Sequence, residues 1–200
     1  MSSAKKDLST AILDKKKAPN KLIVEDATND DNSVVMITNA KMEELKIFRA
    51  EHVIMKGKKR KQTMAIVLNT PNGDPLEDGY IRMNKTVRRN LRVRLGDVIT
   101  IHAAHDVPNG NRVHILPFDD TIEGVAGNIT QTYLIPYFKD AYRPVTKGDT
   151  FIVRGGFKAI EFKVVETDPG EHIIIAPNTM IHDEGEPIHR EDEEKADGVG

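Results

Sequence analysis

Cysteine and tryptophan are absent from the 200 residues, and aromatic residues of every kind make up only 5% of them. A chain without cysteine cannot form a disulfide, use a thiolate nucleophile or build a Cys-ligated zinc site. The scarcity of aromatic rings also leaves few surfaces on which nucleic-acid bases could stack. These two absences remove several common classes of function before any motif is considered.

Long apolar runs are missing as well. No stretch approaches the roughly 18 apolar residues that a membrane-spanning helix needs. The N-terminal sequence MSSAKKDLST lacks the apolar core of a secretory signal. We therefore expect neither membrane insertion nor export.

Catalytic signatures are equally scarce. The P-loop pattern G-x-x-x-x-G-K-[ST] does not occur, so we expect no nucleotide hydrolysis by this chain and no cofactor within it. The seven histidines are scattered, and only His102 and His105 stand close together. With no H-E-x-x-H motif, the sequence predicts no metal site and no catalytic residue.

Basic residues are concentrated in two places. One is the run Lys56–Lys61, and the other is the stretch YIRMNKTVRRNLRVRLGDVITI, residues 80–101. In the second stretch we expect a short helix followed by a strand from Leu91, whose alternation would place Arg92 and Arg94 on one exposed face. Solvated surface, nucleic acid and a protein partner all remain possible explanations for these clusters, since arginine suits polar interfaces of each kind.

The chain divides into segments of different character. Residues 1–20 are polar and suggest a mobile arm, and residues 188–200 are acidic, lack periodicity and suggest a linker toward an ATPase module. Between them, short runs rich in β-branched residues predict strands over 21–107 and again over 112–187, separated by the Pro- and Gly-containing stretch 105–111. A helix of about two turns is expected over KMEELKIF, residues 41–48. The insert 70–79 should be a protruding and poorly ordered loop.

A weak internal repeat organises the first half. Residues 48–54 (FRAEHVI) match residues 93–99 (VRLGDVI) at an offset of 45, and each copy follows a short helical segment. Such a duplication is typical of a pseudo-symmetric barrel. We therefore expect a mainly β protein made of two small closed or nearly closed barrels with short helices.

Several long motifs together resemble one known family. Five motifs carry the resemblance, in the same order as in that family: the stretch 80–101, LPFDDTIEGVAGNI, YLIPYFKDAYRPVTKGDTFIVRGG, AIEFKVVETDP and EGEPIHREDEE. The chain resembles the N-terminal domain of valosin-containing protein, a ubiquitin-directed AAA ATPase segregase. The resemblance extends from about Asp7 to Glu194. It implies a double-psi β-barrel followed by a smaller four-stranded β-barrel, and ATPase modules that use ATP and Mg²⁺ in the parent hexamer.

The resemblance also implies a docking function. In that family a groove between the barrels receives UBX domains and short Arg-rich helical motifs of adaptor proteins, including ubiquitin-handling heterodimers. The parent works in the cytoplasm and nucleus and is recruited to the endoplasmic reticulum membrane for protein degradation. The matching groove positions are Asp31, Val34, Phe48, Arg49, Ile66, Leu68, Pro108, Asn109, Ala141, Tyr142 and Arg143.

These positions carry specific expectations. Asp31 should pair with an adaptor arginine, and Phe48, Ile66, Leu68 and Tyr142 should form an apolar pocket for an adaptor anchor. Taken without the resemblance, Phe48, Ile66 and Leu68 would be assigned to the barrel core. Pro108 and Asn109 replace a Lys-Tyr pair that is typical of the family, so adaptor preference should differ.

A second surface follows from the same resemblance. It places Arg92, Arg94, Arg154 and Arg190 at or near the first ATPase module of the parent. We expect the isolated chain to be a monomer. The alternative function at this stage is a nucleic-acid-binding barrel that uses the two basic clusters.

Overall fold

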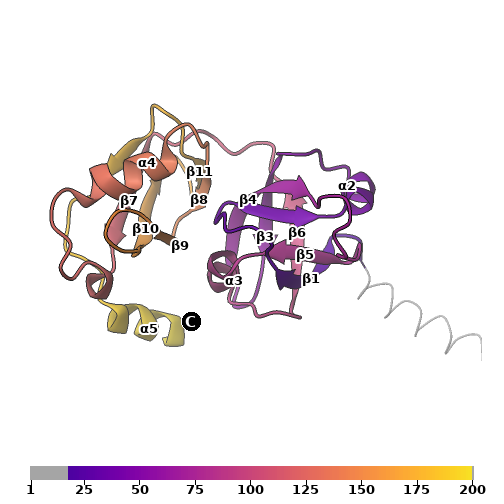
Figure 1. Cartoon of the computed structure of the whole chain (residues 1–200), viewed down its shortest axis with the longest axis horizontal. Helices are drawn as coiled ribbons and strands as arrows, with labels where there is room; N and C mark the ends of the chain where they lie inside the picture. Colours follow the sequence, from indigo (N-terminus) through magenta and orange to yellow (C-terminus); the bar gives the residue numbers. More distant parts are fainter. Residues whose placement is uncertain (1–17, 200) are drawn as a thin grey trace, which may run out of the picture.

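The computed structural model describes residues 18–199 as two β-rich units joined by one connection (Figure 1). The expected N-terminal arm therefore lies outside the described residues except for Ala18, Pro19 and Asn20. Each unit has its own cluster of buried apolar side chains. The mainly β fold class expected from the sequence is confirmed.

The first unit is a closed barrel of six strands in the order β1-β5-β2-β4-β3-β6. Pairing is parallel between β1 and β5 and between β2 and β4, and antiparallel for the other neighbours. The strands are β1 (Lys21–Asp26), β2 (Val34–Ile37), β3 (His52–Lys56), β4 (Gln62–Asn69), β5 (Tyr80–Met83) and β6 (Val98–Ala103).

Alternation of buried and half-buried residues sets the inner and outer faces of β2 and of β4 from Ala65 onward. On β4, Ala65 and Val67 are fully buried in the core, whereas Ile66 and Leu68 between them are only half-buried. The same holds on β2, where Val35 and Ile37 point inward. Successive strand side chains face opposite sides of a sheet, so one apolar set fills the barrel and another remains outside.

The duplication is real, but its offset is 46 residues and not the expected 45. The helices α2 (Asn39–Leu45) and α3 (Lys85–Leu91) are capped by Thr38 and Asn84, whose side chains accept from Lys41 N and Val87 N, respectively. Both helices end at a residue in the left-handed region, Lys46 and Arg92. The positive φ of Ala50 and Gly96 recurs at the same spacing. Sequence similarity favoured an offset of 45 because Arg49, Val53 and Ile54 then match identical residues, whereas an offset of 46 gives no identity over residues 48–54.

The expected strand from Leu91 is wrong. Leu91 is the last residue of α3, Arg92 is its left-handed C-cap, and the strand begins only at Val98. Backbone bonds from Val93 N to Arg88 O and from Asp97 N to Arg94 O close the intervening turn. Arg92 and Arg94 therefore lie on a helix end and a turn, and not on one face of a strand.

The insert 70–79 is held in place more firmly than expected. Asp74, whose side chain is 4% exposed, accepts two bonds from Arg82, from Nε at 3.1 Å and from Nη2 at 2.8 Å. The Thr38 hydroxyl donates to Asp78 at 2.6 Å. Asp74 in the middle of the insert and Asp78 near its end thus fix a loop that composition alone suggested would be poorly ordered.

The second unit contains a four-stranded sheet, β12-β7-β10-β9, and a two-stranded sheet, β11-β8. Aromatic rings of Tyr137, Phe138, Phe151 and Phe162 pack in its core. Its elements are β7 (Arg112–Pro117), η1 (Asp119–Thr121), η2 (Thr130–Leu134), α4 (Ile135–Phe138), β8 (Pro144–Thr146), β9 (Thr150–Val153), β10 (Ile160–Asp168), β11 (His172–Ile174) and β12 (Met180–His182).

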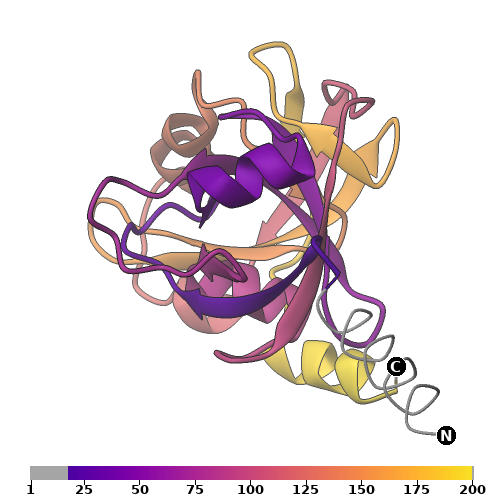
Figure 2. The same cartoon turned by 90° about the vertical axis from the view of Figure 1, so that its right-hand side faces the viewer.

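The acidic C-terminal segment, expected to be a linker, forms a helix, α5 (Arg190–Val199). Three acidic residues in its first turn favour a helix because they complement the positive end of the helix dipole. Viewed along the long axis, α5 lies below the two units and α2 lies across the near end of the barrel (Figure 2). No helix within residues 18–199 is long and apolar enough to cross a membrane.

Candidate functional site

Three half-exposed apolar side chains form a row on the outside of the barrel. Val34 on β2 is the register partner of Ile66 on β4, and Leu68 follows two residues further along β4. Without the family resemblance, Ile66 and Leu68 would have been assigned to the barrel core, and that assignment is wrong. Met36, which pairs with Leu68, extends the row and was missed because nothing in a single strand distinguishes outward from inward residues.

Phe48 stands at one side of this row with 73% of its surface exposed. It follows the left-handed end of α2, and its neighbour Ile47 is buried in the barrel core. The Ala50 amide donates to Val67 O at 2.8 Å, which holds the Phe48 turn beside β4. Arg49, next in the chain, is exposed. Phe48 is thus an outward aromatic on a fixed turn, and not a core residue.

The second unit supplies the opposite wall. Strand β8 contacts β4, and Tyr142, two residues before β8, is 48% exposed. Ala141 is half-buried beside it. Pro108 and Asn109 lie close by, because Ile174 N donates to Pro108 O at 3.0 Å and Ile174 pairs with Pro144 of β8. Ile174 is a half-exposed apolar residue of this wall that sequence reasoning did not identify.

Arg143 joins the two walls. Its Nη1 donates to Asp31 Oδ1 at 2.7 Å and to Ser33 Oγ at 3.0 Å, and its Nε donates to Tyr137 O at 2.9 Å. The guanidinium carbon also lies 4.0 Å from the centre of the Tyr137 ring. Asp31 therefore already has an internal partner, and an incoming arginine would have to share its carboxylate.

An amide network fixes the junction on the same side. Asn32 donates from Nδ2 to Ile152 O at 2.9 Å and accepts from Asn84 at 2.9 Å. These residues, with Asp31, Arg143 and Arg154, line a surface cavity of about 550 Å³ between the units. The junction is thus polar at this end and apolar at the row Val34, Ile66, Leu68.

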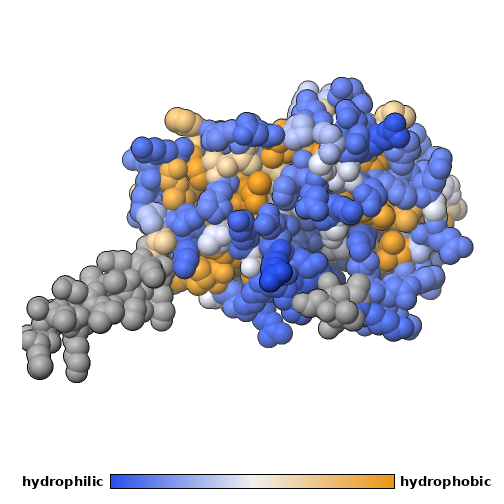
Figure 3. Space-filling view, turned by 180° about the vertical axis from the view of Figure 1, so that it is seen from behind, coloured by the Kyte–Doolittle hydropathy of each residue, from blue (hydrophilic) through white to orange (hydrophobic). Residues whose placement is uncertain are grey.

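We call the set Val34, Phe48, Ile66, Leu68 and Tyr142 the docking face. It contains an exposed aromatic on each wall and a floor of half-exposed aliphatic side chains. Exposed aromatic and aliphatic groups in this arrangement are typical of protein-binding surfaces. From behind, hydrophobic surface is visible as separate patches among hydrophilic side chains on both units (Figure 3).

The four arginines assigned to an ATPase interface do not form one cluster. Arg92 and Arg94 line a basic depression of about 470 Å³ with Lys59, Arg88 and Arg89. Arg154 is on the other unit, strongly exposed and 3.8 Å from Asp30. Arg190 makes a two-bond contact with Asp120, and its guanidinium stacks on Phe118 at 4.5 Å. Arg190 is thus committed to an internal contact, whereas Arg94 and Arg154 are exposed.

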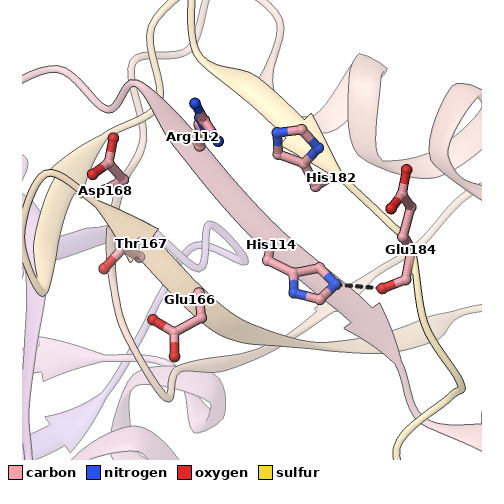
Figure 4. A pocket seen from close by; sticks show the side chains of 7 residues that line it. All are labelled: Arg112, His114, Glu166, Thr167, Asp168, His182 and Glu184. Atoms are coloured by element: carbon pink, nitrogen blue, oxygen red, sulfur yellow. Dashed lines mark hydrogen bonds between the residues drawn. The ribbon is translucent and has the colours of Figure 1, made fainter.

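The outer face of the second sheet holds another cavity, of about 670 Å³, that the sequence did not indicate (Figure 4). His182, His114 and Glu166 are register partners across β12, β7 and β10. His114 Nε2 lies 2.6 Å from the Glu184 carbonyl oxygen. Histidines 68 residues apart meet here only because β12 returns parallel to β7. Among the described residues, no group of three or more His, Asp or Glu side chains is arranged to hold a metal ion.

Family models match both units. Residues 21–107 match the model described as Cell division protein 48 (CDC48), N-terminal domain, and residues 124–190 match that of CDC48, domain 2. The chain belongs to the CDC48 family. Its two units correspond to the adaptor-binding N-terminal region of a CDC48-type AAA ATPase. The N-terminal-domain model matches the six-stranded barrel, and the domain 2 model matches the smaller second unit.

Membership in the CDC48 family helps to choose between the two functions that the sequence left open, adaptor docking and nucleic-acid binding. An adaptor-binding region needs an apolar face with exposed anchors, which the docking face provides. Nucleic-acid binding by the basic clusters is less favoured, because several of their cations are paired with carboxylates. These pairs are Lys58 with Asp97, Arg82 with Asp74, Arg88 with Asp26 and Arg89 with Glu161.

Proposed function

We propose that this CDC48-type region captures UBX-like domains and short Arg-rich helical motifs of adaptor proteins on the docking face. The observation that carries the proposal is the pair of exposed aromatic side chains, Phe48 and Tyr142, on either side of the aliphatic row of Val34, Ile66 and Leu68. An aromatic or leucine anchor of a partner would bury this surface, which is how a few residues come to dominate the affinity of an interface.

The polar end of the face suits an arginine-bearing partner. Asp31 is held by Arg143 with its side chain 43% exposed, so an approaching guanidinium can reach the same carboxylate. Arg143 stays fixed by Tyr137 and Ser33 during such an exchange. We infer that UBX-like domains rely chiefly on the apolar row, and that Arg-rich helices depend in addition on Asp31.

The parent's activity is part of the same proposal. The sequence contains no P-loop, so we assign ATP and Mg²⁺ to the ATPase modules of the parent and not to this chain. Adaptors bound to the docking face would deliver ubiquitinated proteins to the parent hexamer in the cytoplasm and nucleus and at the endoplasmic reticulum surface. Arg92, Arg94 and Arg154 would meet the first ATPase module.

The test is a calorimetric titration of the chain with a UBX domain, repeated with an Arg-rich helical peptide as competitor. Phe48→Ala should weaken UBX binding at least tenfold, because truncating a central anchor removes most of its buried contact. Phe157→Ala is the matched control, since Phe157 is 80% exposed but belongs to the β9–β10 turn of the second unit. Equal affinities for the two variants, or no binding by the unmodified chain at high micromolar concentration, would contradict the proposal.

A further inference from the structure

The two units meet through a buried contact between Asp149 and Thr63. Thr63 is on β4 of the barrel, and Asp149 lies in the turn between β8 and β9, on the side of the second unit that faces the barrel (Figure 1). Both side chains are buried, and the Thr63 hydroxyl oxygen lies 2.9 Å from Asp149 Oδ1 and 3.0 Å from Oδ2. A carboxyl group thus forms part of the junction between the units.

The two short contacts with Thr63 require two protons. A hydroxyl group carries one proton and can donate it fully to only one of the two carboxyl oxygens, but its oxygen can also accept. Asp149 Oδ2 accepts from Thr146 N at 2.9 Å. A proton on Oδ1 would be donated to the Thr63 oxygen, while the Thr63 hydroxyl donates to Oδ2. Both contacts are then hydrogen bonds, so the protonated carboxyl fits this geometry better than the ionised one.

No cation among the described residues pairs with Asp149. Arg143 lines the same small cavity, but its Nε and Nη1 donate to Tyr137, Asp31 and Ser33. The cavity has a volume of about 30 Å³, which is room for about one water molecule. A buried charge with neither a cation nor bulk water is costly, and burial accordingly raises the pKa of this carboxyl to about 7.

The neighbouring titratable groups respond at other pH values. His172 of β11 lies 2.8 Å from Thr146 Oγ1, and burial lowers its pKa. Burial raises the pKa of Tyr137, which is already far above neutral in an ordinary tyrosine. Lys147, next to the turn, pairs with Glu166 at 3.0 Å. The pKa values of His172 and Tyr137 thus shift away from neutral pH, whereas that of Asp149 shifts toward it.

The remaining elements packed against the turn present groups that do not titrate. Asn90 of α3 donates to Thr150 O at 3.0 Å and accepts from Thr150 N at 2.8 Å. Val164 of β10 donates its backbone N–H to Asp149 O at 2.8 Å. The proton on Asp149 is therefore the local variable that changes charge within the junction near neutral pH.

The Asp149–Thr63 contact joins the strands that carry the two walls of the docking face. Ile66 and Leu68 follow Thr63 on β4. On the other unit, Tyr142 lies just before β8, and Thr146, the last residue of β8, donates to Asp149. A change in this contact therefore acts on the spacing between the aliphatic row and the Tyr142 wall.

We propose that Asp149 and Thr63 form a proton-dependent contact between the two units. The protonated carboxyl donates to Thr63 and holds the β8–β9 turn against β4, and loss of the proton loosens the turn from the barrel. The spacing of the docking walls would then depend on pH, being tight below neutral pH and looser above it. This inference concerns the two units alone and does not depend on the identity of any adaptor.

Pulsed electron paramagnetic resonance can measure the spacing because the chain contains no native cysteine. Nitroxide labels would be attached to Glu43→Cys on α2 and Thr132→Cys on η2, two exposed positions on different units. Distances would be recorded at about pH 5.5 and about pH 8.5, on either side of the pKa of Asp149. We expect a narrow distance distribution at the lower pH and a broader one, extended to longer distances, at the higher pH.

Three variants of the labelled chain assign the effect to this contact. Asparagine is isosteric with the protonated acid and donates without titrating, so Asp149→Asn should keep the narrow distribution at both pH values. Thr63→Val removes the hydroxyl and should give the broad distribution even at the lower pH. Thr63→Ser restores the hydroxyl and should behave as the labelled chain with Thr63.

Each of three results would overturn the proposal. One is the same distance distribution at both pH values in the labelled chain with native Asp149 and Thr63. Another is a pH-dependent distribution in Asp149→Asn, which would assign the change to a different group. The third is a narrow distribution for Thr63→Val at the lower pH, which would show that Thr63 does not hold the turn. The Thr63 variants decide the matter on their own should Asp149→Asn fail to fold.

Discussion

At the scale of single residues, Asp149 is the most unusual group in the chain. It is buried in the turn between β8 and β9, where it accepts from Thr146 N at 2.9 Å and from the Thr63 hydroxyl of the barrel at 2.9 and 3.0 Å. Burial raises the pKa of this carboxyl to about 7, and the two donors offset only part of that effect. Asp149 thus places a titratable contact at the junction of the two units.

Asp149 gives a prediction for stability against pH. The unfolded carboxyl titrates near 3.8 and the folded one near 7, so between these values the folded chain keeps a proton that the unfolded chain has lost. The free energy of unfolding should therefore fall by about 1.4 kcal/mol per pH unit over this window. Asparagine cannot ionise, so in Asp149→Asn the midpoint of urea denaturation should depend less on pH between pH 5 and 7. The same slope in both chains would contradict the raised pKa.

Other single residues show where sequence reasoning stopped. Ile66 and Val67 are adjacent β-branched residues, and nothing local distinguishes the docking residue from the core residue. Their roles depend on which side of β4 the barrel closes. Asp31 was expected to pair with an adaptor arginine, but in the fold it accepts a hydrogen bond from Arg143, which is 112 residues away in the chain. Long-range pairing of this kind leaves no mark on a single sequence.

At the scale of elements, the acidic end of the chain is held by a network around Glu161. This carboxylate on β10 is buried, and it accepts from Arg190 of α5 at 2.7 Å and lies 3.5 Å from Arg89 of α3. Lys163 of β10 also pairs with Glu193 of α5. One strand of the second unit therefore connects the barrel helix and the C-terminal helix.

Replacing Glu161 should release that helix. Glu161→Gln would leave Arg89 and Arg190 without their shared charge, and we expect a loss of about 2 kcal/mol, between the values for exposed and buried pairs. Hydrogen exchange should accelerate over residues 190–195. Glu166→Gln is a suitable control, because Glu166 is on the same strand but pairs with Lys147 at an exposed site. Unchanged exchange in α5 of the Glu161 variant would show that other contacts anchor the helix.

The elements themselves were largely predictable. Runs such as SVVMIT and MAIVLN correspond to β2 and β4, and the helix expected over 41–48 overlaps α2. The C-terminal helix was missed because residues 188–200 have no apolar periodicity. Arg190 and Glu193 secure it through ion pairs instead, and such contacts are invisible to a search for hydrophobic faces.

At the scale of the whole molecule, both units contribute side chains to the proposed docking face, and exposed arginines lie elsewhere. The units are linked by Asn90, which exchanges two hydrogen bonds with the Thr150 backbone at 2.8 and 3.0 Å, and by the Arg143–Asp31 pair. Adaptor binding and ATPase contact can therefore occupy different parts of the molecule.

This separation predicts the behaviour of Arg94 in the parent ATPase. Arg94→Ala should change the nucleotide-dependent position of this region relative to the ring while leaving UBX affinity unchanged, because Arg94 is not part of the docking face. Small-angle scattering of the full-length hexamer in each nucleotide state, with titration of the same protein, measures both. Identical scattering profiles for variant and unmodified protein would rule out a positioning role for Arg94.

The sequence by itself determined the β-rich class, the break between two units, the duplication and the family, because these depend on local pattern and on long ordered motifs. Only the tertiary structure decided the 46-residue register, the exposure of Phe48 beside Ile66, the internal partner of Asp31 and the pairing of His114 with His182. Each of these depends on which strands become neighbours when the barrel closes. Closure brings together residues far apart in the chain, so their contacts follow from topology and not from any single segment.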